Sequence, residues 1–219
     1  MSSSQTFLKR ALDIAVSALA LIVATPIFLL VSFIIRIDSP GPVFFRQQRL
    51  GKNGSLFGIY KFRTMLRDAR PLSNPDGSRL VMEMDPRVTR VGGFLRRTSL
   101  DELPQLINIL KGELSLVGPR PDEPHSLSLY TARERIKLQV KPGLTGLAQI
   151  NGRNAIPWEK RKQLDVEYAE NFSLLLDLKV LCKTVPVVFQ CAGIIGDSKP
   201  LSVSASGSDG TSHAEPGLI

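Results

Sequence analysis

A run of 25 residues from Ala11 to Ile35 constrains the fold of this chain more than any other feature. Twenty of the 25 are apolar, and no charged residue occurs from Ile14 to Ile35. About 20 such residues form a helix long enough to cross the hydrocarbon core of a bilayer. A cleavable signal peptide fits poorly, because the run is too long and lacks a small-residue cleavage site followed by a soluble domain. A membrane helix is therefore favoured, and a buried core helix is the alternative.

Basic residues flank the apolar run on both sides. Lys9 and Arg10 precede it. Six more basic residues follow before residue 64, and Asp38 is the single acid among them. The six are Arg36, Arg46, Arg49, Lys52, Lys61 and Arg63. Since positive charge marks the cytoplasmic side of a membrane, both ends are expected to face the cytoplasm. Pro26 removes a helical hydrogen bond in the middle of the run, so the helix is expected to kink or reverse at Thr25 and Pro26. The flanks slightly favour a re-entrant hairpin over a kinked span.

The charge of the whole chain points to a polyanionic partner. It has 28 Lys and Arg against 20 Asp and Glu, a net charge of +8. Anionic membrane lipids, phosphorylated substrates and nucleic acid all fit such a charge. Aromatic residues make up only 6% and do not alternate with the basic ones, which disfavours a nucleic-acid platform. Two cysteines and two histidines are too few for a disulfide scaffold or a metal centre built on these residue types.

The rest of the pattern predicts a mostly α fold with a small β element. Short strands are expected at residues 43–45 and 56–62, around a basic turn at 51–54, with a surface loop at 70–85. A short basic helix or turn is expected at residues 88–97. Amphipathic helices are expected at 101–114, 123–140 and 158–172. Residues 173–195 suit helices in the membrane interface, with an ordinary core helix as the alternative. The predicted organisation is a membrane hairpin at 1–36, a cytosolic catalytic core with interfacial helices at 37–195 and a disordered tail at 196–219.

Two adjacent carboxylates, Asp101 and Glu102, are the leading candidates for chemistry. One interpretation is structural, a capping box in which Ser99 caps the helix and Glu102 reaches back to it. The other is functional, because phosphate groups and metal ions also bind at helix N-termini. An ionised carboxylate can attack phosphorus if cations neutralise the phosphoryl oxygens. Mg²⁺ and the arginines Arg96 and Arg120 could provide that charge.

Two loops add candidate ligand contacts. The first, residues 118–121, holds Arg120 between two prolines, whose fixed φ angles lower the entropy lost on gripping a phosphate. The second begins at Pro142 and Gly143 and ends near Arg153; its glycines allow a backbone to approach a ligand closely. A rigid connector and a plain surface turn are the alternatives for these loops. The chain has no Walker loop and no dinucleotide-binding fingerprint.

Four stretches together resemble a known family. They are residues 61–65 (KFRTM), 100–112 (LDELPQLINILKG), 115–121 (SLVGPRP) and 142–153 (PGLTGLAQINGR). In this order they resemble the bacterial sugar transferases, monotopic phosphoglycosyl transferases that act on polyprenyl phosphate. The resemblance covers roughly residues 7–188. The chain looks like a small, minimal-core member of this family. Residues 151–158 look most similar to the enzymes that load N,N′-diacetylbacillosamine phosphate for protein glycosylation.

The resemblance implies a reaction and roles for the residues that match. The family moves a sugar 1-phosphate from a UDP-sugar to undecaprenyl phosphate, releasing UMP, as the first membrane step of glycoconjugate biosynthesis. Its re-entrant hairpin keeps the protein on the cytosolic face of the bacterial inner membrane. Asp101 matches the nucleophile that forms a covalent aspartyl-phosphosugar, and Glu102 matches its Mg²⁺-binding partner, with Asp101 as a second metal ligand. The substrate-binding candidates are Arg96, Arg120, Lys61, Pro142, Gly143 and Arg153.

A second hypothesis is a membrane-anchored scaffold without catalysis, which would bind an anionic partner through Arg46, Arg49 and Lys52. The intact Asp101–Glu102 pair argues against an inactive homologue. Thr25 stands where a serine is common in related members, which leaves the insertion depth of the hairpin open. The sequence also leaves open the sugar, the pathway, the role of the tail, and whether the amphipathic helices join the chain into a homo-oligomer.

Overall fold

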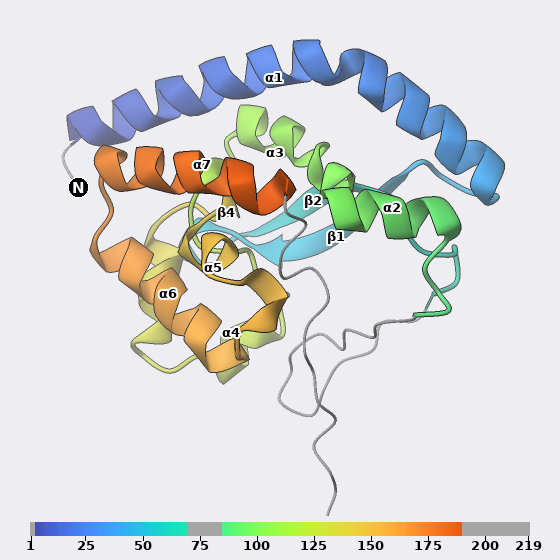
Figure 1. Cartoon of the computed structure of the whole chain (residues 1–219). Coiled ribbons are helices and arrows are strands. Elements are labelled where there is room, and N and C mark those ends of the chain that lie inside the picture. The colour runs from blue at the N-terminus through green and yellow to red at the C-terminus, as the bar shows by residue number, and fades with distance from the viewer. Residues whose placement is uncertain (1–2, 70–84, 190–219) are drawn as a thin grey trace, which may run out of the picture.

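The computed structural model describes residues 3–69 and 85–189, and in this part the chain is mostly helical with a small β element, as predicted (Figure 1). The helices are α1 (Ser3–Asp38), α2 (Arg90–Thr98), α3 (Gln105–Lys111), α4 (Ser126–Leu129), α5 (Leu147–Ile150), α6 (Trp158–Glu170) and α7 (Leu174–Phe189). The strands are β1 (Phe44–Leu50), β2 (Leu56–Phe62), β3 (Ser115–Val117) and β4 (Gly143–Thr145). Short 3-10 helices are η1 (Lys52–Gly54), η2 (Leu100–Glu102), η3 (Glu134–Gln139) and η4 (Arg153–Ala155).

Helix α1 runs without interruption through Pro26 and arches over the rest of the body (Figure 1). The hydroxyl of Thr25 donates to the carbonyl of Leu21 at 2.9 Å, the local back-bond available to threonine. The predicted helix-break-helix is therefore a bend within one continuous helix. A proline can be accommodated in this way because a bend relieves its clash with the preceding turn.

The apolar side chains of α1 are largely uncovered by protein. Residues Ser4–Asp38 are long and apolar enough to cross a membrane, and only 17% of the most apolar window is buried. Ile22 and Leu29, for example, are 72% and 70% exposed. A buried core helix would have these side chains covered. The exposure therefore favours contact with lipid over the core-helix alternative.

The N-terminal end of α1 is tied to the body by buried polar contacts. Lys9 Nζ donates to Asp177 Oδ2 at 2.6 Å and to the carbonyl of Val117 at 3.0 Å. Asp13 Oδ1 accepts from the backbone N–H of Leu116 at 3.0 Å. Buried charges are rarely tolerated unless paired in this way. These contacts hold the start of α1 against β3 and α7.

The C-terminal end of α1 is capped by a buried arginine. Arg63 is 6% exposed, and its guanidinium donates to the carbonyls of Ser39 at 2.6 Å and Pro40 at 2.7 Å. These carbonyls follow the last turn of α1 and lack helical partners, and a cation there also complements the helix dipole. Both ends of α1 are therefore attached to the same body.

Replacing Lys9 by methionine is expected to destabilise this attachment. The change leaves Asp177 without its cation, and breaking a buried pair in this way costs about 3 kcal/mol. For a chain of this size such a loss lowers the melting temperature by roughly 6–12 °C. Thermal unfolding of purified protein measures it. Lys179→Met is the matched control, because Lys179 lies exposed on the same helix as Asp177; equal melting temperatures for the two variants would contradict the prediction.

The core below α1 has two parts. The larger lies among β2, α3, β3, α6 and α7, and includes Ile109, Leu114 and Val180. The smaller lies under the C-terminal half of α1, where Ile35 packs with Phe62 and other residues. Strands β1 and β2 form an antiparallel hairpin around the turn that the sequence predicts. The larger core supports the loops that carry the polar site.

Several elements differ from the sequence predictions. The first strand extends to Leu50, and β3 and β4 form a parallel pair that was not predicted. The expected helix at 101–114 divides into η2 and α3, and Gly112 ends α3 with a φ of 83°. The expected helix at 123–140 is wrong: only α4 and η3 are helical, because Tyr130 between them is extended and buries its hydroxyl against Asp122. Helix α6 agrees with prediction. Residues 174–189 are helical within the expected 173–195, with Val180 in the larger core, and their place in the membrane interface stays a prediction. Of the expected loop at 70–85 only Asp85 is described, and the tail lies outside the described residues.

Candidate active site

The two adjacent carboxylates follow a tight turn between α2 and η2. Gly92 allows α2 to pack closely on the strand end, since a Cβ there would lie 2.0 Å from the carbonyl oxygen of Thr64. One α2 turn later, Arg96 Nε donates to the hydroxyl of Thr64 at 2.9 Å. Ser99 then takes a left-handed conformation, with a φ of 58°, which reverses the chain. After this turn, Asp101 lies close enough to Arg96 for the positive charge of the arginine to act on its carboxylate.

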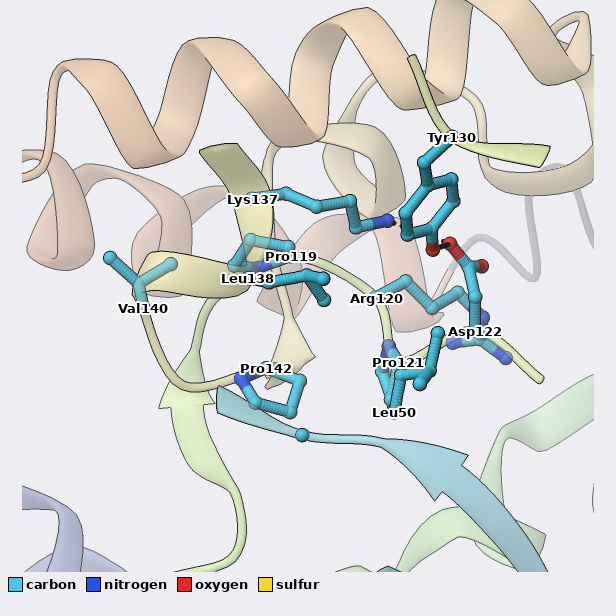
Figure 2. Close-up of a pocket in the computed structure, with 11 residues that line it drawn as sticks. Leu50, Pro119, Arg120, Pro121, Asp122, Tyr130, Lys137, Leu138, Val140 and Pro142 are labelled. Atoms are coloured by element: carbon cyan, nitrogen blue, oxygen red, sulfur yellow. Dashed lines mark hydrogen bonds and ion pairs between the residues drawn. The ribbon is translucent and has the colours of Figure 1, made fainter. Parts of the chain in front are cut away.

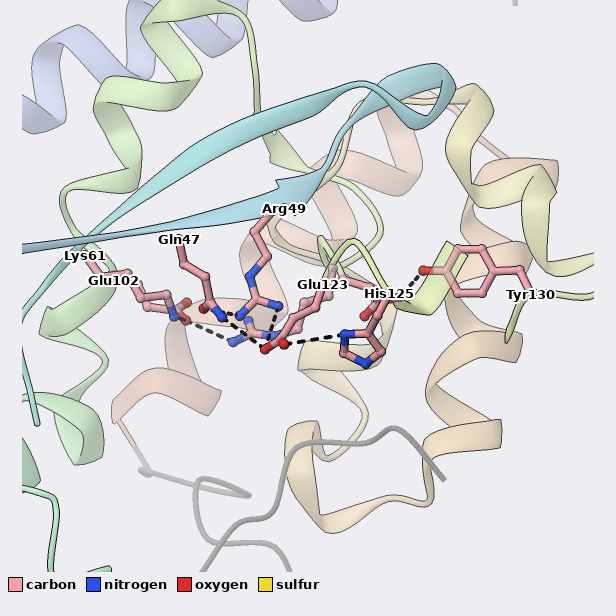
Figure 3. A network of polar contacts seen from close by, with 9 residues as sticks. Gln47, Arg49, Lys61, Glu102, Glu123, His125 and Tyr130 are labelled. Carbon is pink, nitrogen blue, oxygen red and sulfur yellow. Dashed lines mark hydrogen bonds and ion pairs between the residues drawn. The ribbon is translucent and has the colours of Figure 1, made fainter. Parts of the chain in front are cut away.

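Glu102 is held between two cations (Figure 3). Its Oε1 atom accepts from Lys61 Nζ at 2.6 Å and from Arg120 Nη2 at 3.0 Å. The capping box expected as the structural alternative is not formed, because Ser99 Oγ instead accepts from Arg153 Nη1 at 3.2 Å. Three of the predicted substrate-binding cations thus lie within hydrogen-bonding distance of the 99–102 turn.

These cations fix the charge of Glu102. Burial by itself would raise the pKa of this carboxyl. The charges of Arg120 and Lys61, with their hydrogen bonds, outweigh burial and hold the pKa of Glu102 well below its usual range. Glu102 is therefore ionised at neutral pH, and its hydrogen bonds hold both cations.

Asp101 is in a different environment from its neighbour. It is 8% exposed, and no residue in the described part of the chain forms a hydrogen bond or an ion pair with its carboxylate. Burial raises the pKa of Asp101, while the charges of Lys61, Arg96 and Arg120 oppose the rise. Glu102 is therefore bonded to two cations, whereas Asp101 is buried near cations without a hydrogen bond to any described residue. An unbonded carboxylate oxygen is available for nucleophilic attack.

The loop before Arg120 is held by the strand pair that was not predicted. Gly143 N donates to the carbonyl of Pro119 at 2.8 Å, and a Cβ at Gly143 would lie 2.1 Å from Gly118 N. Pro142 contributes its carbonyl to the N–H of Ser115. Pro142 and Gly143 thus support the loop through the backbone, and their contact with a ligand stays a prediction.

A second polar row lies next to the Glu102 cluster and was missed by the sequence analysis (Figure 3). Glu123 accepts from Gln47 Nε2 at 3.2 Å and pairs with Arg49 Nη1 at 3.3 Å. His125 Nδ1 lies 3.7 Å from the other carboxylate oxygen of Glu123. The one sequence signal was the alternation of Gln47 and Arg49 on a strand, which places both side chains on one face.

The basic surface required by the scaffold hypothesis does not form as one patch. Arg49 is engaged with Glu123, whereas Arg46 lies over the ring of Tyr60, 5.5 Å from its centroid. Because side chains alternate between the faces of a strand, Arg46 and Arg49 lie on opposite faces of β1. This arrangement counts against the scaffold hypothesis.

The acidic groups limit how a metal ion could bind. In residues 3–69 and 85–189 no three His, Cys, Asp or Glu side chains gather as a metal site. Mg²⁺, however, is commonly bound by one or two carboxylates together with substrate phosphates and water. Both cations of the cluster contact Oε1 of Glu102. Asp101 and Glu102 therefore fit Mg²⁺ in combination with a bound diphosphate and not as a cage made by protein alone.

Comparison with known proteins gives one consistent family. The family model described as "Bacterial sugar transferase" matches residues 4–191. The uncharacterized sugar transferase EpsL of Bacillus subtilis is 47% identical over 189 residues, which cover 85% of this chain and 90% of the relative. These residues include all four stretches on which the sequence resemblance rests.

Two further relatives carry the name of a sugar. The undecaprenyl-phosphate galactose phosphotransferase of Salmonella typhimurium is 41% identical, over 87% of this chain and 42% of its own length. The UDP-glucose:undecaprenyl-phosphate glucose-1-phosphate transferase of Escherichia coli is 42% identical, over 84% of this chain and 41% of its own length. The similarity thus covers less than half of these two longer relatives.

Proposed function

Because the chain belongs to the bacterial sugar transferase family, we propose that it transfers a sugar 1-phosphate from a UDP-sugar to undecaprenyl phosphate. The products would be UMP and an undecaprenyl-diphosphate sugar. The observation that carries this proposal is the pair formed by Asp101 and Glu102. Asp101 is buried without a hydrogen-bonding partner among the described residues, beside a glutamate that fixes Lys61 and Arg120.

The reaction proceeds in two displacements at the same phosphorus. In the first, an Asp101 carboxylate oxygen attacks the β-phosphorus of the UDP-sugar. The bond from this phosphorus to the bridging oxygen breaks, and UMP leaves with the electron pair. Lys61, Arg96 and Arg120 neutralise the phosphoryl oxygens as charge develops. In the second displacement, an oxygen of undecaprenyl phosphate attacks the aspartyl-phosphosugar and releases the Asp101 carboxylate.

Mg²⁺, held by Glu102 and Asp101 with the diphosphate oxygens, would supply further charge neutralisation when bound. Glu102 keeps Lys61 and Arg120 aligned whether or not the ion is present. Burial of Asp101 keeps water from competing for its carboxylate and for the aspartyl-phosphosugar.

The attachment of α1 supports a re-entrant membrane topology. A single span would place its two ends on opposite sides of the bilayer. Here Lys9 and Asp13 near one end, and Ser39 just beyond the other, all bond to the same body. The basic flanks favour the cytosolic face and attract anionic lipids. The protein would then sit on the cytosolic face of the bacterial inner membrane, where the acceptor phosphate also lies.

The rate of the first displacement is expected to fall on acidification. Asp101 attacks only when ionised, and burial raises its pKa above the ordinary value of 3.8. Protonation therefore inactivates the enzyme at a higher pH than a solvent-exposed aspartate would require, while Glu102 stays ionised. Single-turnover UMP release measured across pH tests this. A rate that stays constant down to a pH of about 4 would contradict it.

The donor and the mechanism are tested in one experiment. Solubilised protein is incubated with Mg²⁺ and a panel of UDP-sugars in the absence of any lipid acceptor, and UMP and the intact protein mass are measured together. Roughly one UMP per protein, with a matching sugar-phosphate adduct, is expected for a covalent intermediate. The sugar in the adduct identifies the donor. The names of two relatives above carry galactose and glucose, so a diacetamido sugar stays a prediction from the sequence resemblance.

The other outcomes are equally informative. Turnover that requires undecaprenyl phosphate, with no adduct in its absence, would replace the covalent intermediate by direct transfer in a ternary complex. If no donor gives UMP, with or without the acceptor, the proposal is overturned and the scaffold hypothesis is favoured instead. Neutralising Arg46, Arg49 and Lys52 would then be the next test, since that hypothesis places partner binding on these residues.

A further inference from the structure

The backbone of Arg120 is fixed by a buried group that the proposed reaction does not use. Among residues 119–121, Arg120 alone has a backbone N–H, because proline has none. That N–H donates to Asp165 Oδ1 at 3.2 Å, while the guanidinium donates to Glu102. The arginine is thus attached through its backbone to α6 and through its side chain to the 99–102 turn.

A single ammonium group joins the carboxylates on either side of this arginine. Lys137 is 4% exposed, and its Nζ donates to Asp165 Oδ2 at 2.5 Å and to Asp122 Oδ2 at 2.8 Å. Asp122 follows the Pro-Arg-Pro turn directly, and it also accepts from the hydroxyl of Tyr130. Figure 2 shows Lys137 and Tyr130 converging on Asp122 beside Arg120. The ammonium therefore connects the residue that binds the arginine N–H with the residue that ends the turn.

Stability alone does not account for this group. Replacing a buried ion triad with apolar side chains of similar volume is often neutral or stabilising, because the charges pay a large desolvation cost. Burial would lower the pKa of Lys137, but Asp122 and Asp165 outweigh it and raise the pKa above its ordinary value. Lys137 stays charged, and its two hydrogen bonds fix the distance between the carboxylates of Asp122 and Asp165.

We infer that Lys137, Asp122 and Asp165 are positioning residues that set the orientation of Arg120, and thereby the place of its guanidinium at Glu102. This inference rests on the proposed function, in which Arg120 binds a phosphate of the donor. Without the ammonium, two carboxylates of like charge face each other and push the two sides of the turn apart. A displacement of about 1 Å in a group that binds the reacting phosphate can slow a reaction about 100-fold.

A double-mutant cycle tests whether the three residues act through Arg120. Lys137→Met is expected to slow UMP release about 100-fold in the wild-type background. In the Arg120→Ala background the same change is expected to slow it less than about threefold, because the group it positions is gone. UDP serves as a binding probe in the same four proteins, and its affinity is expected to follow the same pattern. Equal factors in both backgrounds would overturn the inference.

Two further variants separate positioning from folding. Asp165→Asn keeps the volume of the side chain. It replaces Lys137→Met in the cycle if thermal unfolding shows that the Lys137→Met variant does not fold. Lys162→Met is the matched control, because Lys162 lies on the same helix as Asp165 but pairs with Glu134. It is expected to release UMP at the wild-type rate. If wild-type protein releases no UMP, the proposed function fails, whereas an additive cycle in an active enzyme overturns only the positioning role.

Discussion

Asp101→Asn is expected to abolish UMP release and the covalent adduct, with a loss of at least about 10,000-fold in turnover. The amide has nearly the shape of the carboxylate but cannot form a bond to phosphorus under these conditions. Because Asp101 makes no hydrogen bond or ion pair within the described residues, the substitution breaks no contact there. Burial also raises the pKa of Asp101, so a neutral side chain at this position removes a desolvation cost. The variant should fold at least as stably as wild type.

The measurement is intact protein mass and UMP after incubation with the donor, together with thermal unfolding. Asp68→Asn is the matched control, because Asp68 is exposed and in the described structure lies in no ion pair. It should form the adduct in full. An adduct of unchanged size on the Asp101 variant would remove this residue from the role of nucleophile, and its position could then be mapped by proteolysis and mass spectrometry.

Glu102→Gln is expected to slow turnover about 100-fold without preventing the adduct. The nucleophile remains, but the neutral amide no longer holds Lys61 and Arg120 by charge, so both cations lose their alignment on the phosphoryl oxygens. The two variants therefore differ in kind: one has no adduct at any time, and the other forms it slowly. Single-turnover kinetics of adduct formation distinguish them.

This second variant is also expected to be less stable. Glu102 is ionised and bonded to two cations, and removing its charge leaves Lys61 and Arg120 without the carboxylate that holds both of them. Glu159→Gln is a suitable control, since that glutamate is exposed on α6. Turnover by Glu102→Gln equal to that of the control would show that the cations do not depend on Glu102, and the cluster would need another explanation.

Local patterns in the sequence were enough for part of the fold and of the site. The apolar run from Ala11 to Ile35 identified a helix that is long and apolar enough to cross a membrane, since length and lack of charge are properties of one continuous segment. The amphipathic pattern of residues 158–172 located α6, and the interrupted apolar stretch 173–195 located α7. Asp101 and Glu102 were found because they are neighbours in the chain, with Arg96 one helical turn and a short loop before them.

Other features could not be predicted because they depend on residues far apart in the chain. Lys61 was a candidate only through a family motif and Arg120 through its proline-flanked loop. Their meeting at Glu102 spans 41 and 18 residues of chain. The capping box was an equally valid local interpretation, and it lost because an ion pair with two cations is stronger than one backbone hydrogen bond. The expected helix at 123–140 failed for a similar reason, since the buried hydroxyl of Tyr130 overrides helical spacing.

By itself, then, the sequence determined that an apolar helix is followed by a basic, mostly helical body that contains two adjacent carboxylates. Periodicity and adjacency encode such features locally. Only the tertiary structure decided that both ends of α1 attach to one body and that Glu102 and not Asp101 takes the cations. It also placed Lys137 in contact with Asp165, 28 residues further along the chain, and Asp165 in turn accepts from the backbone N–H of Arg120. Those outcomes depend on which buried charges find partners when distant segments pack together, because an unpaired charge costs more than any local preference can offset.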